Sequence, residues 1–255
     1  MMKKTVFITG ATSGIGHATA KRLASEKYDL ILTGRRNERL EVLKNELEQN
    51  SGCRVLTLCF DIRKLTELQA AVDSLPSEWQ TIDVLVNNAG LALGLAPLHE
   101  GAIEDWECMI DTNVKGLLYA TRILSPRMVA RKSGHIVNVC SISGKGVYPN
   151  GAVYCATKHA VDAITTGMRM DFLPYGIRVT QVCPGAVETE FSMVRFHGDK
   201  NRADRVYEGF KPLVPEDVAE AICYAISQPA HVNVQDITIL PTAQANVSMF
   251  HKTTH

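Results

Sequence analysis

Seven short, mostly apolar runs recur along the chain, and the stretches between nearly all of them are long enough to hold a helix. The runs are residues 5–9, 29–33, 54–60, 82–86, 135–140, 177–183 and 236–240. Most of them are apolar throughout instead of alternating, which is typical of strands buried on both faces. Parallel strands joined by crossover helices meet that condition. The pattern therefore predicts an α/β fold, a doubly wound and mainly parallel sheet of seven strands with helices on both faces.

Length and spacing favour one domain. The chain has 255 residues, enough for one large domain or two small ones. It has no internal repeat, no low-complexity tract and no Pro/Ser-rich linker to mark a boundary. We therefore expect a single domain over residues 1–255.

The charge balance excludes several classes of partner. The 27 Lys and Arg residues offset the 27 Asp and Glu residues, so no net charge attracts nucleic acid or an anionic membrane. No segment approaches the roughly 18 consecutive apolar residues of a membrane span, and the apolar stretch after Lys4 is too short for a signal peptide. Seven cysteines without a Cys-x-x-Cys pair predict neither a disulfide framework nor a zinc site. We therefore expect a cytoplasmic protein. We also expect no bound metal, because His251 and His255 lack a third ligand.

A glycine-rich turn joins the first predicted strand to the first helix. Residues 10–16 read GATSGIG, with the spacing GxxxGxG. The backbone N–H groups and the positive end of a helix can receive a pyrophosphate there, although a tight strand-to-helix turn would need glycines as well. We predict a dinucleotide site that includes Gly10, Thr12, Ser13, Gly14, Ile15 and Gly16.

The end of the second strand predicts which dinucleotide binds. In the Rossmann arrangement an acidic residue there binds the ribose of NAD, whereas arginine favours the 2′-phosphate of NADP. This chain has Arg35 and Arg36 and no acid, so NADP is the predicted cofactor. The alternative for both arginines is a solvated flank of the next helix, which Asn37 is expected to cap. Asp61, after the third strand, either accepts a hydrogen bond from adenine or is a solvated turn residue.

Further motifs follow in a fixed order: NNAG at residues 87–90, Asn113, Ser141, Tyr154-x-x-x-Lys158 and Pro184-Gly185. Together with the glycine turn they resemble the short-chain dehydrogenase/reductase family over nearly the whole chain. The resemblance implies a Rossmann fold and a homotetramer built through helices around residues 105–130 and 154–172 and through the C-terminal strand. It also extends the expected cofactor site to Ile62, Asn88, Tyr154, Lys158, Pro184, Gly185, Val187 and Thr189.

The chemistry of four residues agrees with that resemblance. Tyr154 and Lys158 are four residues apart and share one face of a helix. A free phenol has a pKa of about 10, and a nearby ammonium favours the phenolate, so we expect Tyr154 to be the general acid/base and Lys158 to lower its pKa. Ser141 follows the fifth strand and either binds the substrate oxygen or caps a turn. Asn113, by resemblance only, supports Lys158 through a water molecule.

Several longer stretches, at residues 33–40, 75–79, 87–94, 106–116, 189–196 and 229–233, resemble the NADP-dependent 3-hydroxy acid dehydrogenases, also described as serine or allo-threonine dehydrogenases. The resemblance implies oxidation of a short 3-hydroxy acid, such as L-allo-threonine, serine or 3-hydroxypropionate, and reduction of the semialdehyde. The alternatives are a reductase for a steroid, sugar or acyl chain and a non-catalytic NADPH-binding regulator.

Two basic residues are candidates for the substrate carboxylate. Arg195 lies in the segment from about 187 to 210, which in the family forms a lid over the site, and we expect it to pair with the carboxylate. Its alternative is a solvated lid arginine. Lys145 is either a second carboxylate contact or an exposed loop lysine.

Overall fold

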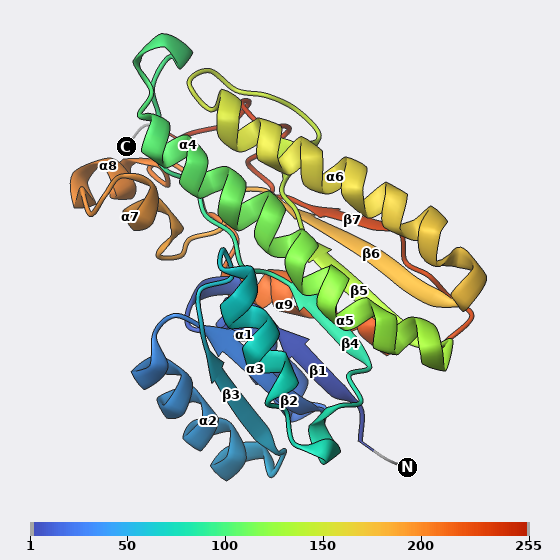
Figure 1. The fold of residues 1–255 in the computed structure, drawn as a ribbon. Coiled ribbons are helices and arrows are strands. Elements are labelled where there is room, and N and C mark those ends of the chain that lie inside the picture. The colour runs from blue at the N-terminus through green and yellow to red at the C-terminus, as the bar shows by residue number, and fades with distance from the viewer. Residues whose placement is uncertain (1–2, 254–255) are drawn as a thin grey trace.

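All strands of the computed structural model, which describes residues 3–253, belong to one parallel sheet (Figure 1). The strand order is β3-β2-β1-β4-β5-β6-β7, and every neighbouring pair is parallel. Each predicted run overlaps one strand, with no end more than two residues away, so the predicted sheet is confirmed. The strands are β1 (Thr5–Ile8), β2 (Asp29–Gly34), β3 (Val55–Cys59), β4 (Val84–Asn87), β5 (Gly134–Val139), β6 (Ile177–Pro184) and β7 (Asp236–Ile239).

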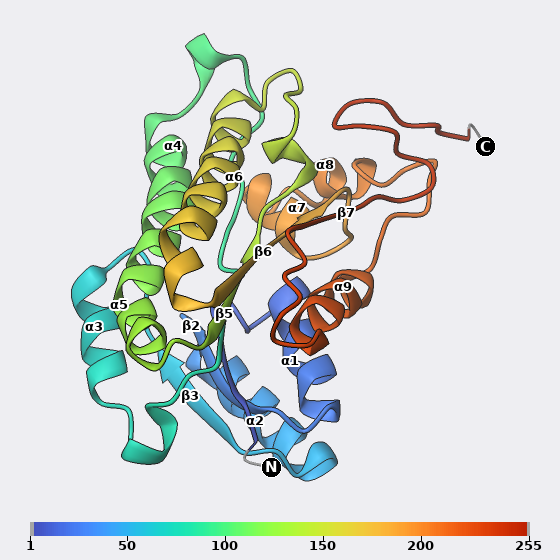
Figure 2. The same ribbon diagram turned by 90° about the vertical axis from the view of Figure 1, so that its right-hand side faces the viewer.

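Helices cover both faces of the sheet (Figure 2). An apolar cluster lies on each face of the sheet, and consecutive side chains of β1 contribute to both. Val6 and Ile8 belong to the first cluster and Phe7 belongs to the second. The first cluster is completed by α1 (Gly14–Ser25), α2 (Asn37–Ser51) and α9 (Pro215–Ser227). The second is completed by α3 (Leu65–Asp73), α5 (Leu117–Arg131) and α6 (Ala152–Phe172).

Two helices differ in detail from the sequence predictions. Leu40, Leu43 and Leu47 of α2 are buried as predicted, but Asn37 does not cap that helix. The cap position belongs to Arg36, the last residue with non-helical backbone, and Asn37 is already helical. The predicted helix around residues 105–130 consists of α4 (Ile103–Ile110), a π-helical turn at Asp111–Gly116 and α5.

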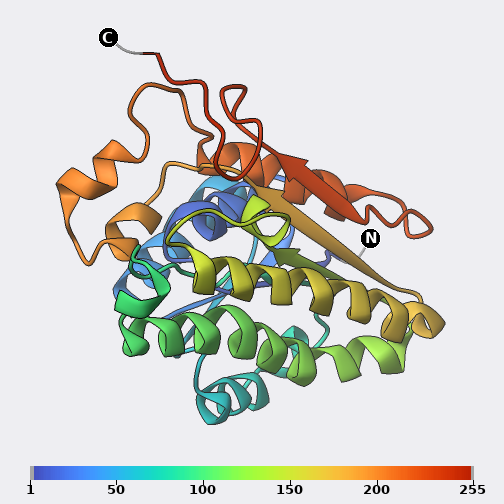
Figure 3. The ribbon, with the colours of Figure 1, turned by 90° about the horizontal axis from the view of Figure 1, so that it is seen from above.

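The carboxyl ends of the strands meet at one edge, where the loops after β1, β4, β5 and β6 converge. From β1 the chain first builds β2 and β3 on one side and then β4 on the other. Ligands of such sheets bind where the order reverses. Two short helices, α7 (Phe191–Arg195) and α8 (Lys200–Arg205), lie at this edge, and the C-terminal stretch after β7 packs on the loop that follows α8 (Figures 2 and 3).

Candidate active site

A cavity of about 500 Å³ opens at the carboxyl edge of the sheet. Its wall is built from the glycine turn, from the ends of five strands and the residues that follow them (β2 to β6), from α6 and α7, and from the C-terminal stretch. Every predicted site residue except Gly16 and Asn113 lines it. These are Gly10, Thr12, Ser13, Gly14, Ile15, Arg35, Arg36, Asp61, Ile62, Asn88, Ser141, Tyr154, Lys158, Pro184, Gly185, Val187, Thr189 and Arg195.

At three positions of the glycine turn, the backbone conformation or a close contact requires glycine. Gly10 has φ +69° and Gly14 has φ +54°, in the region that favours glycine. A Cβ on Gly16 would lie 2.4 Å from the carbonyl oxygen of Gly10. Ser13 is the N-cap of α1, and its side chain makes no capping hydrogen bond within the described part of the chain. The first N–H groups of α1 are therefore available at the cavity, which fits a pyrophosphate.

Arg35 and Arg36 have different environments. Arg36 donates to the hydroxyls of Thr12 (2.8 Å) and Ser13 (2.7 Å) and forms an ion pair with Glu190 at 2.9 Å. Arg36 is therefore an exposed residue at the start of α2, but its side chain is bound to the glycine turn and to Glu190. Arg35 is exposed at the cavity and has no ion-pair partner among residues 3–253. Its guanidinium is free to contact a phosphate beside the ordered Arg36.

Sequence reasoning missed two charged partners at this end of the cavity. Glu190 also pairs with Arg39 at 2.7 Å, and hydrogen bonds from Arg36 and then Arg39 hold the pKa of Glu190 below its ordinary value. Asp61 is paired with Arg63, whose Nε lies 3.0 Å from Oδ1, and this contact lowers the pKa of Asp61. Asp61 is therefore an ion-paired carboxylate at the cavity and not a freely solvated turn residue.

Tyr154 and Lys158 come from one face of α6, and both are buried. Lys158 Nζ donates to the carbonyl oxygen of Val139 at 3.1 Å and lies 6.0 Å from the centre of the Tyr154 ring. Burial raises the pKa of Tyr154 above its ordinary value and lowers the pKa of Lys158. The pKa of Tyr154 is therefore not lowered as expected in this structure, because loss of hydration is the largest influence on it and the Lys158 ammonium lies 6.0 Å from the ring centre.

Ser141 and Asn113 hold the loops around that tyrosine. The Ser141 hydroxyl accepts a hydrogen bond from the N–H of Ser143 at 3.0 Å, so it caps a short 3₁₀ turn while it lines the cavity. Asn113, in the π-helical turn, bonds both backbone groups of Leu91 at 2.8 Å. A Cβ on Gly90 would lie 3.3 Å from Asn113 Oδ1 and 3.5 Å from Lys158 Nζ. Asn113 and Lys158 therefore approach the same glycine.

Arg195 is held against the cavity by its surroundings. Its Nε donates to the carbonyl oxygen of Gly94 at 3.2 Å, and its guanidinium lies 5.3 Å from the ring centre of Tyr148 and 5.9 Å from that of Tyr154. The alternative of a solvated lid arginine is wrong. Within the described residues, Arg195 Nη2 and Tyr148 Oη are buried without a hydrogen-bond partner. Both residues line the cavity, and sequence reasoning did not single out Tyr148.

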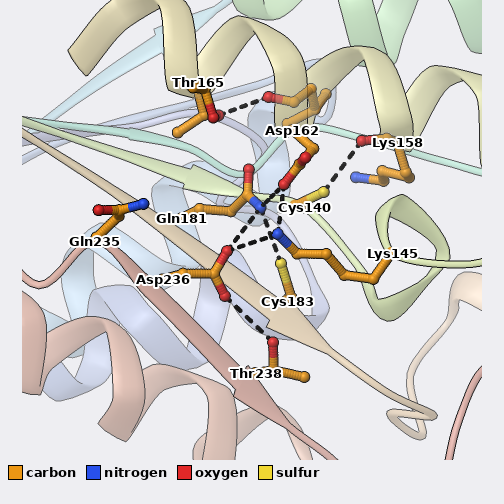
Figure 4. Close-up of polar contacts among 12 residues, drawn as sticks. Cys140, Lys145, Lys158, Asp162, Thr165, Gln181, Cys183, Gln235, Asp236 and Thr238 are labelled. Atoms are coloured by element: carbon orange, nitrogen blue, oxygen red, sulfur yellow. Dashed lines mark hydrogen bonds and ion pairs between the residues drawn. The ribbon is translucent and has the colours of Figure 1, made fainter. Parts of the chain in front are cut away.

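Lys145 is an exposed loop residue, as the second interpretation has it, but it is ion-paired. It does not line the cavity and lies between two carboxylates, Asp162 of α6 at 2.5 Å and Asp236 of β7 at 2.8 Å (Figure 4). Gln181 of β6 donates to the same two carboxylates. Lys145 therefore joins the turn after Ser141 to α6 and the sheet and is not a substrate contact.

The part of the chain that the structure describes has no metal site and no membrane-spanning helix. Within residues 3–253, no three His, Cys, Asp or Glu side chains are arranged to hold a metal ion. His255, one of the two histidines at the C-terminal end, lies outside the described residues. In the same part of the chain, no helix combines the length and the apolar character that crossing a membrane requires.

Comparison with known proteins agrees with this geometry. Residues 4–200 match the short chain dehydrogenase family. Over 241 residues, the chain is 47% identical to the NADP-dependent 3-hydroxy acid dehydrogenase YdfG of Salmonella typhi, covering 94% of this chain and 96% of that protein. It is 45% identical over 245 residues to sulfoacetaldehyde reductase 2 of Chromohalobacter salexigens, with 96% of each covered.

A solved structure is also similar over the whole length. The closed form of serine dehydrogenase complexed with NADP+ has a TM-score of 0.91 and 43% sequence identity, and the match covers 98% of this chain and 100% of that one. The family match spans more than half of the residues, and the sequence identities extend over nearly all of them. The chain therefore belongs to the short chain dehydrogenase family.

Proposed function

We propose that this protein transfers a hydride between NADP(H) and a short 3-hydroxy acid or the corresponding semialdehyde. The observation that carries the proposal is that Arg195 and Tyr148 both line the cavity that contains Tyr154, while Arg195 Nη2 and Tyr148 Oη have no hydrogen-bond partner among residues 3–253. A half-buried guanidinium favours a substrate that brings its own anion. Relatives named for 3-hydroxy acids and for serine support this choice, because both substrates carry a carboxylate.

NADP is the cofactor that the residues fit. The glycine turn and the start of α1 would receive the pyrophosphate, and Arg35, next to the ordered Arg36, would contact the 2′-phosphate. Asp61 lies at the same end of the cavity. The NADP-dependent relative and the NADP complex of serine dehydrogenase support the same cofactor.

The residues around Tyr154 would handle the proton and the orientation of the substrate. When bound, NADP supplies or accepts the hydride. Tyr154 gives its phenolic proton to the carbonyl oxygen during reduction and takes it back during oxidation. Ser141 donates a hydrogen bond to the same oxygen. Lys158 uses one ammonium proton on Val139 and keeps two for the nicotinamide ribose, while Asn113 positions the loop that carries Leu91.

The segment 187–210 would close over the bound ligands as a lid of the single domain. It carries α7 and α8 and supplies Arg195 to the cavity. Glu190, at its start, is tied to Arg36 beside the glycine turn. This ion pair supports a lid that would cover both the cofactor and the substrate parts of the cavity.

Two other functions are less well supported. A reductase for a steroid, sugar or acyl chain would leave the Arg195 guanidinium without a counterion in the cavity. A regulator that only senses NADPH needs no buried Tyr154 beside Ser141. Sulfoacetaldehyde, the substrate named for one relative, is also a short aldehyde with an anionic group and therefore belongs among the substrates to be compared.

The test is a set of initial rates on the purified protein. L-allo-threonine, L-serine, 3-hydroxypropionate and 3-hydroxyisobutyrate are each offered NADP and NAD, and malonic semialdehyde and sulfoacetaldehyde are offered NADPH. We expect turnover of at least one hydroxy acid with NADP. Turnover with NAD alone would contradict the role of Arg35, and no turnover of any acid would contradict the substrate class.

We also propose that the protein is a cytoplasmic homotetramer. Support for assembly comes from large apolar side chains on the outer surface of α4, α5 and α6. Ile103, Leu118 and Met170 are 60%, 41% and 69% exposed. Exposed apolar groups on neighbouring helices are typical of a surface that a second copy covers.

A further inference from the structure

The last described stretch of the chain, residues 241–253, forms part of the cavity wall and is called the strap below. Its side chains Gln244, Val247 and Phe250 line the cavity that contains Tyr154 and Arg195. Nothing in the sequence pattern singles out these three residues. Figure 2 shows the strap as the red stretch that follows β7.

The strap has a defined shape. Gln244 and Phe250 form an antiparallel bridge, and the N–H of Ala245 donates to the carbonyl oxygen of Met249 at 3.0 Å. Asn246 Oδ1 accepts from the N–H groups of Ser248 (3.0 Å) and Met249 (2.9 Å), which closes the turn between them. The strap is therefore a folded hairpin with Val247 at its turn and not a loose tail.

The strap is fastened to both loops that flank the substrate end of the cavity. A Cβ on Gly146, in the loop between Ser141 and Tyr154, would lie 3.1 Å from Val247. Phe250 packs on Phe210 with ring centres 5.0 Å apart, and the N–H of Thr253 donates to the carbonyl oxygen of Gly209 at 2.8 Å. These contacts bridge the loop before Tyr154 to the end of the lid.

Gln244 anchors the strap at the third side of the cavity. Its Oε1 accepts from the N–H of Ala186 at 2.8 Å, directly after Pro184-Gly185. A Cβ on Gly185 would lie 2.3 Å from that oxygen, so the backbone and the amide are in close contact. The strap, which carries Val247 and Phe250, is therefore attached to the end of β6 through Gln244.

We propose that Val247 and Phe250 determine the size of the substituent that the substrate carries beyond its carbinol carbon. This inference rests on the proposed function. With the carboxylate at Arg195 and Tyr148 and the reacting oxygen at Tyr154 and Ser141, a chain that continues past the carbinol carbon has to meet the remaining wall. That wall is apolar, and one methylene group that a pocket cannot accept costs about tenfold or more in kcat/KM.

The test compares substrates that differ only in this substituent. The series is 3-hydroxypropionate, 3-hydroxybutyrate, 3-hydroxypentanoate and 3-hydroxyhexanoate, each with NADP. For the wild type we expect kcat/KM to fall by about tenfold or more between the butyrate and the hexanoate. Phe250→Ala should bring this ratio close to one, and Val247→Phe should move the fall to the butyrate. Met249→Ala is the matched control, because Met249 belongs to the same turn, is 62% exposed and does not line the cavity.

A second series separates this inference from the proposed function. Unbranched aldehydes from propanal to hexanal, reduced with NADPH, need no carboxylate contact but meet the same wall. A wild type that oxidises no hydroxy acid contradicts the proposed function, and the aldehyde profiles of wild type and Phe250→Ala still test the strap. Unchanged profiles of Phe250→Ala and Val247→Phe in both series overturn the inference. If thermal melting shows that Phe250→Ala is unfolded, Phe250→Leu takes its place.

Discussion

The position of Arg195 in the folded protein is unfavourable for the free energy of folding. A charged guanidinium that is partly removed from water, with one donor nitrogen buried and unpartnered among the described residues, is unfavourable by about 1–3 kcal/mol unless something pairs with it. The Gly94 carbonyl and the three aromatic rings around it offset only part of that cost. Such an arrangement is expected where a bound ligand supplies the missing contact. We propose that the substrate carboxylate supplies it.

Replacing Arg195 by methionine tests the carboxylate contact directly. Methionine keeps the length and the apolar contacts with the rings but removes the charge. We expect KM for 3-hydroxypropionate to rise by about tenfold to a hundredfold, the equivalent of one charge-assisted hydrogen bond. KM for a neutral aldehyde such as propanal should stay near its wild-type value. An equal rise for both substrates would mean that Arg195 holds the lid and not the acid.

The raised pKa of Tyr154 predicts opposite pH behaviour for the two directions of the reaction. Below its pKa the phenol is protonated and ready to donate, so reduction by NADPH should be nearly independent of pH around neutrality. Oxidation needs the phenolate, whose population rises tenfold per pH unit below the pKa. We therefore expect kcat/KM for oxidation to rise with a slope near one between about pH 7 and 9. Initial rates in both directions across this range check the prediction.

Tyr154→Phe is the control for that profile. The substitution removes one oxygen atom and leaves the ring, which packs edge-on against Phe191 at a centroid distance of 5.7 Å. Turnover should fall by about a hundredfold to ten-thousandfold in both directions, while NADPH still binds. A variant with normal turnover would contradict the role of Tyr154 as acid and base.

At the scale of the elements, β5 and β6 are joined by a buried histidine. His135 is 2% exposed, its Nε2 lies 2.8 Å from Thr180 Oγ1, and its Nδ1 has no partner among the described residues. Burial, and then the nearby charges of Arg178 and Lys4, lower its pKa to about 3. The folded protein therefore keeps His135 neutral at pH values where the unfolded chain binds a proton.

This histidine predicts a loss of stability in mild acid. The folded pKa is lowered, so the full contribution is present above the unfolded pKa of about 6.5 and is lost as the pH falls from there toward 3. The free energy of unfolding should drop by up to about 1.4 kcal/mol per pH unit in this window. Urea unfolding at pH 7 and pH 5 measures the drop, and His135→Gln should show a clearly smaller one. Equal slopes for both proteins would assign the acid sensitivity to other groups.

Elements were easier to predict than their contacts, and the reason is physical. A run of apolar residues buried on both faces has few alternatives, so all seven strands were predicted from the sequence. The same holds for the glycine turn, where steric room dictates the residue type. Pairings between distant segments leave no local pattern. Lys145 with Asp236 and Arg36 with Glu190 therefore appear only in the structure.

The same limit applies to the substrate end of the site. Ser141, Tyr154 and Lys158 are recognisable from their spacing, because a strand end and one helix face bring them together. The strap is a different case, since Val247 and Phe250 are held at the cavity by contacts with residues far away in the sequence, such as Gly146 and Phe210. Neither contact corresponds to a motif in the sequence. The turn that brings Val247 and Phe250 into position begins at Asn246.

At the scale of the whole molecule, the proposed tetramer predicts which surface holds the copies together. The outer layer of α4, α5 and α6 exposes Leu118, whereas α2 on the other face of the sheet exposes Val42 at 68%. Leu118→Glu would place a charge on the surface that a second copy is proposed to cover, and desolvating an unpaired charge costs several kcal/mol. Light scattering should give four chains for the wild type and for Val42→Glu but a smaller assembly for Leu118→Glu. A wild-type mass of one chain would contradict the tetramer, and an unchanged mass for Leu118→Glu would assign the contact to another face.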